Sequence, residues 1–559
     1  MGAYWLSISI GPVQGFIAAA RRTRDLWYGS WLLSEISKAA ALDLHEQGVR
    51  IVLPGVESAA ELQPDSDLNV TNKILAHVPD PLDPAQVFAS AERAAWARLR
   101  SEAGQVLGDI AVFINKGRWE NQIDDFLEIY GAWVPDEGYD SRRAVEQLLN
   151  GRKALRDFGP GHGAALVPKS SLDAMRESVL RHRQPLSEDS LRRLDLRASE
   201  QLDAIGFIKR LGQGRRQYPS IGRIAADPWL RRLAKGEPEE QRTLADLKAL
   251  AARLQDLPCL SAPQFAHFPF DSSICYPSRL ADALPAPEHG ELRKQIKGLV
   301  KRGPSPYMTV LTADGDHMGA LIDSLQTMEE VQALSQELSR FAEKSKGIVA
   351  EHYGALVYAG GDDVLALLPL DQAVAAARRL HDVYSDILTP VAGGANPTLS
   401  VGIAVNHYLE PLTDILTRTR ETGQFAKEPD RNGLAICLQK RAGGDALLVR
   451  YRWDDDPDER LAKWIALLES DDVPMGAAYE LHMLSSRYPK GDDAWVYQAL
   501  RADAERVLKR KEIQDAASLA RAMELLFDDA HTADDFTHNV RMMLLAVQLV
   551  QMSRADDSE

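Results

Sequence analysis

Two acidic turns, 48 residues apart, constrain the fold of this chain more than any other feature. The segment YMTVLTADGDHMGALIDSL is typical of a buried strand over 307–313, an acidic turn at 314–316 and a following helix. The segment GALVYAGGDDVLALLPL predicts a hairpin with its turn at 360–363. A helix, a strand and another helix that ends at Ala426-Lys427 come next. This βαββαβ order predicts a ferredoxin-like palm.

The palm topology predicts that carboxylates from both turns converge. The first strand and the hairpin lie side by side in such a sheet, so Asp314 should face Asp362 and Asp363. Three close carboxylates repel one another unless a hard divalent cation, Mg²⁺ or Mn²⁺, neutralises them. Metal held by a few carboxylates and by phosphate oxygens is the usual arrangement for nucleotidyl transfer. Gly360 and Gly361 lack a Cβ and would let a triphosphate approach the backbone.

Lys427 stands at the predicted end of the last palm helix. A cation at that place would neutralise charge that develops on a phosphate. A solvated lysine at a helix end is the alternative, and the sequence leaves both open.

The overall composition excludes several classes of protein. With 65 Lys+Arg against 81 Asp+Glu, the net charge of −16 argues against a free-standing, broadly basic nucleic-acid binder. The three cysteines include no CxxC pair, so we expect neither a disulfide scaffold nor a zinc site. No apolar run approaches the ~20 residues that span a bilayer, and no signal peptide is evident. We therefore expect a cytoplasmic protein without a membrane partner.

Elements along the chain suggest four domains. A strand at 3–10, a helix from about Val13 to His45 and a strand at 49–55 open the sequence, and DIAVFIN at 109–115 is a candidate strand. The expected fold class is α+β, with these domains: a first, degenerate palm at 1–115, a mainly helical intervening domain at 116–295, a second palm with GGDD at 296–445, and a C-terminal helical bundle at 446–559.

A basic segment at 181–235 stands out in an acidic chain, with 13 lysines and arginines against six acidic residues. A solvated helical face is one explanation. Contact with RNA phosphates or with an acidic partner is the other. Charge reversal of Arg215 and Arg216 would weaken assembly only under the second explanation.

Several motifs together resemble a known family, the large palm-domain subunit of type III-B (Cmr) CRISPR–Cas effector complexes. The resemblance covers nearly the whole chain, and its motifs are these: SIGPVQGFIAAARRTRDLWYGSWLLS, RKALRDF, LVPKSSLDAMRESVL, LTADGDHMG, YAGGDDVLALLPL, TLSVGIAVNH and AKEPDRNGLAI. The family implies two palms, of which only the second carries GGDD. It also implies partner subunits, a guide RNA, and a target RNA that switches on conversion of ATP into cyclic oligoadenylates.

The resemblance also implies roles for single residues. Asp314, Asp362 and Asp363 match the metal-binding carboxylates, and Lys427 matches the lysine after the last palm helix. Residues expected to contact nucleotides are Gly315, Gly360 and Gly361 in the second palm and Gly29, Ser30 and Asn72 in the first. Asp316 belongs to the same motif, but its side chain would serve equally well as a cap of the following helix.

The sequence departs from the family in two respects. Many members begin with a His-Asp phosphohydrolase domain that cuts DNA, and here the first palm is expected to start at residue 3. The dipeptide His381-Asp382 lies on a predicted palm helix and is read as helix surface. Zinc-binding cysteines of some relatives are absent as well. DNA cleavage by this chain is therefore not expected.

Three other functions compete with cyclic oligoadenylate synthesis. Some relatives without the nuclease domain join AMP to S-adenosylmethionine, and the motifs do not exclude that acceptor. A scaffold with a vestigial palm is disfavoured by the intact set of aspartates. A diguanylate cyclase of the GGDEF type would need Glu at the fourth turn position, where this chain has Asp363.

Overall fold

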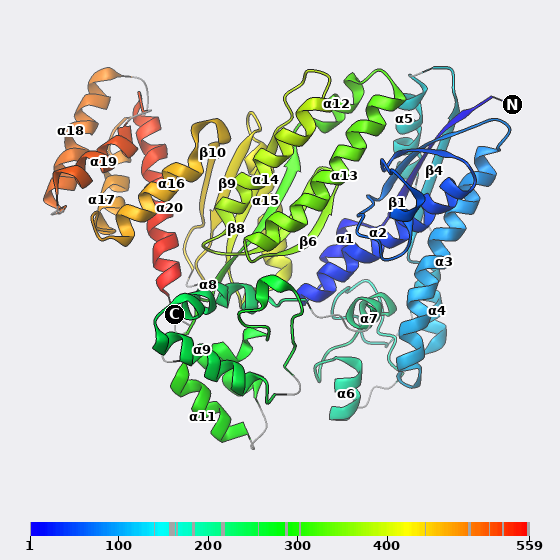
Figure 1. Ribbon diagram of the computed structural model, residues 1–559, viewed down its shortest axis with the longest axis horizontal. Helices are drawn as coiled ribbons and strands as arrows, with labels where there is room; N and C mark the ends of the chain where they lie inside the picture. Colours follow the sequence, from blue (N-terminus) through cyan, green and yellow to red (C-terminus); the bar gives the residue numbers. More distant parts are fainter. Residues whose placement is uncertain are drawn as a thin grey trace.

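The computed structural model describes residues 2–138, 140–155, 163, 166–181, 185–213, 218–254, 257–284, 289–300, 303–441, 443–489, 493–511, 513, 515–527 and 530–555. Figure 1 shows the N-terminal sheet at one end of the molecule, a larger sheet in the middle and the C-terminal helices at the other end. Helices α8, α9 and α11 of the intervening segment lie below the central sheet in this view.

The N-terminal sheet has ferredoxin-like topology. Its elements are β1 (Tyr4–Gly11), α1 (Gln14–Ala18), α2 (Thr23–Glu46), β2 (Arg50–Leu53), β3 (Lys73–Val78), α3 (Pro84–Ile110), α4 (Lys116–Asp124), β4 (Glu128–Pro135) and α5 (Ser141–Ala154). The strand order is β2-β3-β1-β4, and each neighbouring pair is antiparallel. Helix α2 packs on α3, and its buried residues complete the core with β1 and β3. The expected first palm is present.

Three details of the first palm correct the sequence-based expectation. The helix expected from Val13 to His45 is two helices, α1 and α2, separated at residues 19–22. The segment 109–115 is the end of α3 and a short 3₁₀ turn rather than a strand, with Ile114 alone in a β-bridge. The fourth strand is β4, which pairs with β1 along its whole length, so the domain extends beyond the predicted boundary at 115.

The central sheet contains the second palm. Its elements are β5 (Tyr307–Gly315), α12 (Met318–Ser324), α13 (Met328–Glu351), β6 (Ala355–Gly360), β7 (Asp363–Pro369), α14 (Ala373–Leu388), β8 (Leu399–His407), α15 (Leu412–Lys427), β9 (Gly433–Leu438) and β10 (Leu447–Arg452). The strand order is β10-β9-β8-β5-β7-β6, and β8-β5-β7-β6 repeats the topology of the first palm. The predicted hairpin is confirmed, whereas β10 extends the sheet past the predicted boundary at 445.

Helices make up the rest of the described chain. The intervening segment contains α6 (Glu188–Leu194), α7 (Ala204–Leu211), α8 (Ile221–Lys235), α9 (Pro238–Ala251), α10 (Leu280–Ala283) and α11 (Gly290–Leu299). The C-terminal helices are α16 (Pro457–Glu469), α17 (Gly476–Ser485), α18 (Ala494–Arg510), α19 (Ala516–Phe527) and α20 (Ala533–Arg554). As predicted, the C-terminal part is a helical bundle, in which α20 packs on α16, α17 and α19.

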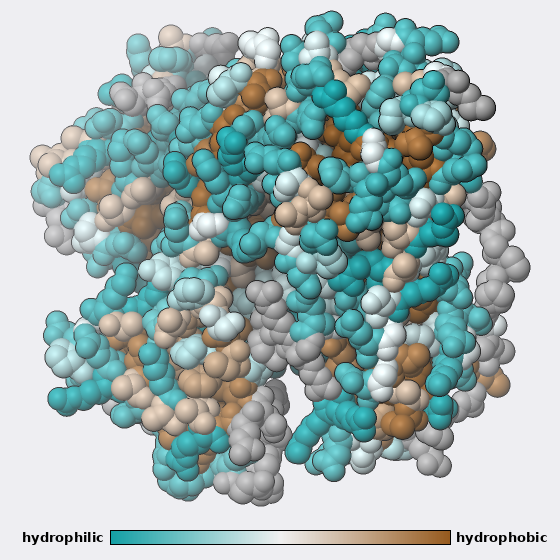
Figure 2. Space-filling view, turned by 45° about the vertical axis from the view of Figure 1, so that its right-hand side comes forward, coloured by the Kyte–Doolittle hydropathy of each residue, from teal (hydrophilic) through white to brown (hydrophobic). Residues whose placement is uncertain are grey.

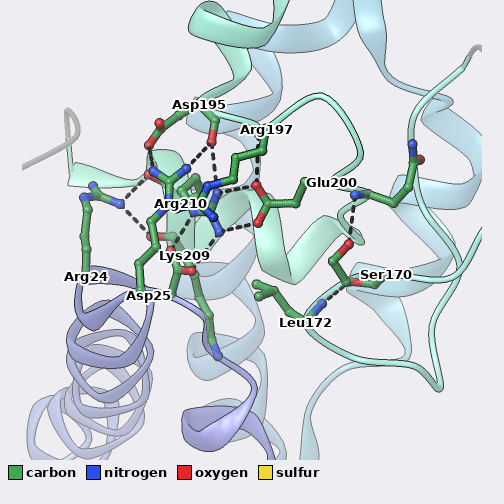
Figure 3. Close-up of polar contacts among 12 residues, drawn as sticks. Arg24, Asp25, Ser170, Leu172, Asp195, Arg197, Glu200, Lys209 and Arg210 are labelled. Atoms are coloured by element: carbon green, nitrogen blue, oxygen red, sulfur yellow. Dashed lines mark hydrogen bonds and ion pairs between the residues drawn. The ribbon is translucent and has the colours of Figure 1, made fainter. Parts of the chain in front are cut away.

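A buried polar network docks α7 of the intervening segment on the first palm (Figure 3). The Arg210 guanidinium, which is fully buried, donates to both carboxylate oxygens of Asp25 at 2.8 and 2.9 Å. It also donates to Glu200 at 3.0 and 3.2 Å. All three buried charges thereby have partners of opposite sign, as burial in a medium of low dielectric constant requires.

Two further cations in the network cap helix ends. Arg24 of α2 donates to the backbone oxygens of Lys209, Arg210 and Gly212 at the C-terminus of α7. Lys209 in turn donates from Nζ to the backbone oxygens of Phe16 and Ala19 at the C-terminus of α1. Cations satisfy unpaired carbonyls at these negative helix ends, so each segment stabilises the end of the other.

The basic segment at 181–235 is partly buried inside the protein, and contact of its exposed residues with RNA or with an acidic partner stays a prediction. Arg210, Arg223 and Lys209 are almost fully buried, and Arg223 pairs with Asp227 at 2.7 Å. Exposed arginines remain at 192 and 197. Arg215 and Arg216 lie outside the described residues. Part of the positive charge thus lies in buried contacts between segments of the protein, which composition alone does not reveal.

The molecular face in Figure 2 is largely hydrophilic, with apolar residues in separate groups. Among the helices of the described residues, none combines the length and apolar character that crossing a bilayer requires.

Replacing Asp25 by Asn should weaken the docking of α7. The substitution removes one of the two carboxylates that pair with buried Arg210, and loss of a buried partner costs about 3 kcal/mol or more. Amide hydrogen exchange should therefore accelerate in α7. The matched control is Asp124→Asn, which breaks an exposed pair with Arg100 and should cost less than about 1 kcal/mol. Equal effects of the two substitutions would contradict the assignment.

Candidate active site

Strand register brings the predicted aspartates together at one end of the central sheet. Asp314, at the end of β5, stands directly opposite Asp363, at the start of β7. Gly360 of β6 pairs with Asp363 on its other side. The backbone amide of Gly315 donates to the carbonyl of Asp362 at 3.1 Å, which ties the hairpin turn to the end of β5. The structure therefore confirms that Asp314, Asp362 and Asp363 converge, as the palm topology predicts.

Burial and mutual repulsion make these carboxyl groups hard to ionise. Burial, and then the charge of Asp314, raise the pKa of Asp362 to about 6. Burial, and then the charges of Asp362 and Asp314, raise the pKa of Asp363 to about 8. Such shifts mark a place where the metal-free protein concentrates more negative charge than it can neutralise.

Lys427 supplies the positive charge nearest to the aspartates. Its Nζ lies 2.5 Å from Oδ1 of Asp314, and only 18% of the side chain is exposed. The solvated-lysine alternative is therefore wrong for this structure. Since α15 ends at Lys427, the position of the ammonium depends on where the turn after this helix is anchored.

Asp316 anchors that turn. Its carboxylate accepts hydrogen bonds from the hydroxyls of Thr398 and Ser400 at 2.8 Å and from the backbone amide of Asn432 at 3.0 Å. Residue 316 is 4% exposed and does not cap α12, so the helix-cap alternative is wrong. Asp316 instead fixes the segment between α15 and β9 beside the carboxylates.

Three glycines leave the room that the site requires. A Cβ on Gly315 would stand 2.1 Å from Oη of Tyr384 and 2.8 Å from Cβ of Asp362. A Cβ on Gly360 would meet the Tyr358 ring at 2.7 Å. Gly361 has a φ of +64°, in the left-handed region that favours glycine. The backbone of this turn is therefore compatible with glycine and with little else.

The first palm reaches the same turn through its 65–72 loop. A Cβ on Gly361 would lie 3.5 Å from Cγ2 of Thr71, which places the loop directly beside the GGDD turn. Helix α2 holds this loop by three contacts: Ser34 Oγ accepts from the amide of Val70 at 2.9 Å, Glu35 accepts from the amide of Asp65 at 3.1 Å, and Lys38 donates to the carbonyl of Ser66 at 2.8 Å. Helix α2 also packs beside β6.

The predicted first-palm residues have structural partners of their own. Asn72 donates from its side chain to the carbonyl of Ile10 at 3.3 Å. Gly29 packs against Lys209, whose Nζ would lie 3.4 Å from an added Cβ, and Ser30 is 8% exposed. Burial lowers the pKa of Lys209 to about 8. Nucleotide contacts by Gly29, Ser30 and Asn72 remain predictions.

His381 is a residue whose environment the sequence did not reveal. Its Nε2 lies 2.9 Å from Oδ1 of Asn432, and its ring lies 5.0 Å from that of Trp453. With a side chain only 12% exposed, it is not helix surface as expected. Because Asn432 also donates to Asp316, His381 belongs to the packing that supports the turn after α15.

The carboxylates of this site are of the type that binds a hard divalent cation whose other ligands are water or phosphate oxygens. In the described part of the chain, no group of three or more His, Cys, Asp or Glu side chains is placed so that the protein alone could hold a metal ion. Asp314 is instead held by Lys427. Mg²⁺ commonly takes one or two carboxylates and completes its octahedron with water and substrate phosphates. One or two carboxylates from Asp314, Asp362 and Asp363 would meet this need, and metal binding here remains a prediction.

A cavity of about 1390 Å³ lies at the seam between the palms and the intervening segment. Its wall includes Trp27 and Tyr218, whose rings stack at 5.7 Å, and the polar face of α13. The three aspartates do not line it. The cavity is therefore distinct from the carboxylate site, which lies at the opposite end of β6.

Comparison with known proteins gives two matches to family models. Residues 307–435 match "Cas10/Cmr2, second palm domain", and residues 5–119 match "CRISPR-associated protein Cmr2, N-terminal". A curated relative, the CRISPR system Cmr subunit Cmr2 of Pyrococcus furiosus, is 30% identical over 168 residues. This alignment covers 25% of the chain and spans 19% of the length of that relative.

Solved structures resemble nearly the whole chain. The apo state of a type III-B Cmr-beta complex matches with a TM-score of 0.66 and 12% identity, over 98% of this chain and 81% of the other. Cmr-beta bound to cognate target RNA matches with a TM-score of 0.64 and 13% identity, over 98% and 83%. The predicted α+β fold with two palms and the resemblance to the Cmr-type palm subunit are confirmed.

The stability of the metal-free protein should depend on pH through Asp362 and Asp363. Because their folded-state pKa values are raised from 3.8 to about 6 and about 8, protonation favours the folded state. This stabilisation is complete below about pH 4 and is lost as the pH rises through 6 and 8. The variant Asp362→Asn/Asp363→Asn should therefore gain melting temperature over the wild type as the pH rises across this window.

The control for this titration replaces two exposed carboxylates of the same domain, Asp386→Asn and Glu421→Gln. Its difference from the wild type should stay nearly constant with pH. A Tm difference for the Asp362/Asp363 variant that does not change between pH 4 and 8, with EDTA present, would contradict the charge crowding described above.

Proposed function

We propose that this chain, which carries the two palm regions of the Cas10/Cmr2 family, is a nucleotidyltransferase that makes cyclic oligoadenylates from ATP. The proposal rests on the strand register that puts Asp314 of β5 opposite Asp363 of β7, with Nζ of Lys427 2.5 Å from Oδ1 of Asp314. Hard carboxylate oxygens and a neighbouring ammonium group at a glycine turn are suited to polyphosphate chemistry.

A divalent cation, Mg²⁺ or Mn²⁺, would be held by Asp314, Asp362 and Asp363, and would supply charge neutralisation and activation of the attacking hydroxyl. Gly360 and Gly361 would let the triphosphate lie against the turn. Lys427 would turn from Asp314 to the phosphates and stabilise their developing charge. The 3′-hydroxyl of one ATP attacks the α-phosphate of the other, forming a phosphodiester and releasing pyrophosphate.

The first palm would hold the second nucleotide. The position of Thr71 supports this role, because a Cβ added to Gly361 would lie 3.5 Å from its Cγ2 and the 65–72 loop therefore lies beside the GGDD turn. Two nucleotides held at fixed positions react as in an intramolecular reaction, which removes much of the entropic cost. Gly29, Ser30 and Asn72 are the proposed first-palm contacts, and Gly315 is a further contact in the second palm.

Partner subunits, a guide RNA and a target RNA complete the proposal. A solved Cmr-beta complex with a similar subunit is bound to cognate target RNA. The net charge of −16 supports a chain that meets RNA within a complex rather than alone. Target RNA would then switch on the palm site.

The test is product analysis with the assembled complex and target RNA. Asp362→Ala/Asp363→Ala should abolish products from ATP and leave assembly unchanged, because the removed carboxylates lie at the metal site. The control Asp386→Ala/Glu421→Ala removes two exposed acids of the same domain and should keep full activity. Products from the Asp362/Asp363 variant would contradict the assignment.

Mass spectrometry of these reactions identifies the acceptor. ATP alone should give cyclic oligoadenylates, and the result should not change when S-adenosylmethionine is added. A product that combines AMP with S-adenosylmethionine would show that S-adenosylmethionine, rather than a second ATP, is the acceptor. The proposed metal site would remain unchanged. No product from the wild-type complex under either condition would favour a scaffold with a vestigial palm.

Lys427→Gln should slow product formation by about 100-fold or more, since the variant loses the cation nearest the phosphates. Single-turnover rates at saturating ATP measure this effect. Lys463→Gln, at an exposed position on α16, is the control and should leave the rate unchanged. A rate for Lys427→Gln equal to that of the control would show that the lysine acts only on Asp314 in the resting protein.

A further inference from the structure

Tyr384 lies beneath the carboxylate site without a partner for its hydroxyl. It belongs to α14, its side chain is fully buried, and its ring packs edge-on against Phe341 at 5.0 Å. Within the described residues, its Oη has no hydrogen-bond partner. An unpaired buried hydroxyl costs about 1–3 kcal/mol, so phenylalanine would suit this packing better.

The position of the hydroxyl suggests why tyrosine stands here. The point where a Cβ of Gly315 would stand is 2.1 Å from Oη of Tyr384 and 2.8 Å from Cβ of Asp362. Tyrosine and aspartate therefore crowd the same small space, which exists because residue 315 has no side chain. The Asp362 carboxyl group begins one bond beyond that Cβ, within reach of the phenol after a side-chain rotation.

The two groups are chemically complementary. A phenol O–H donates to a carboxyl oxygen in either protonation state, and the hydrogen bond is stronger when the acceptor is a charged carboxylate. Burial and the neighbouring aspartates raise the pKa of Tyr384, so the hydroxyl keeps its proton. A cation that binds Asp362 would orient its carboxylate beside Tyr384, where an oxygen of that carboxylate would accept from the unpaired hydroxyl.

We propose that Tyr384 is a positioning residue that donates a hydrogen bond from Oη to the Asp362 carboxylate when this carboxylate binds the divalent cation. The inference rests on the proposed metal site and adds a residue that no motif identified. The hydrogen bond fixes the orientation of Asp362 and leaves its other oxygen for the metal. In the metal-free protein the hydroxyl stays unpaired, so tyrosine stabilises only the loaded state.

The test compares metal affinity with the stability of the metal-free chain. Tyr384→Phe in the full chain should weaken Mn²⁺ binding by about 10- to 100-fold, the usual effect of losing a group that orients a metal ligand. The melting temperature in EDTA should be equal to or higher than that of the wild type, because the variant removes an unpaired polar group. Electron paramagnetic resonance of Mn²⁺ measures free ion, and calorimetry measures melting.

Tyr218→Phe is the matched control. The hydroxyl of Tyr218 is also buried without a partner among the described residues, but it lies in the intervening segment. This variant should show the same neutral or raised melting temperature and unchanged Mn²⁺ affinity. Asp362→Ala should lose Mn²⁺ binding and marks the proposed site.

The outcomes separate the inference from the proposed function. Wild-type binding that Asp362→Ala abolishes but Tyr384→Phe leaves unchanged would overturn the role of Tyr384 alone. A melting temperature in EDTA lowered for Tyr384→Phe and not for Tyr218→Phe would also overturn it, since the hydroxyl would then serve the metal-free fold. A wild-type chain that binds no Mn²⁺ would overturn both the inference and the metal site.

Discussion

Negative charge gathered at one end of β5 is the constraint on which the site depends. Antiparallel pairing puts Asp314 opposite Asp363, and the turn adds Asp362 beside them. One close cation, Lys427, offsets this charge in the structure. Asp316 holds the surrounding backbone through its hydrogen bonds with Ser400 and Asn432. Crowded carboxylates destabilise the protein when they ionise, and the proposed divalent cation would relieve that repulsion.

The second constraint is the fixed relation between the palms. Both have the same strand topology, and the 65–72 loop of one meets the glycine turn of the other through Thr71 and Gly361. Helix α2 holds this loop and is itself clamped by α7 through Arg24 and Arg210. The intervening segment, α2 and the 65–72 loop are thereby connected by packed and hydrogen-bonded groups.

Local patterns in the sequence were sufficient to predict the second palm, because a buried strand, an acidic turn and a glycine hairpin each have distinct residue signatures. They did not predict β4, since EIYGAWVP lacks a clear alternation of apolar and polar residues and its partner β1 lies more than a hundred residues away. The roles of Asp316 and Tyr384 depend on contacts with Asn432 and Gly315, which spacing does not encode. Burial of Arg210 and Lys209 could likewise not be predicted from the sequence, because composition counts charged residues without identifying their partners.

A crystal structure of the chain with Mn²⁺ and a non-hydrolysable ATP analogue is the decisive test of the proposed metal site, because the anomalous signal of Mn²⁺ locates the metal without reference to activity. We expect an ion liganded by oxygens of Asp314 and of Asp362 or Asp363, with the triphosphate against Gly360 and Gly361 and Lys427 turned toward it. Mn²⁺ and nucleotide bound elsewhere, with Lys427 still paired to Asp314, would contradict it.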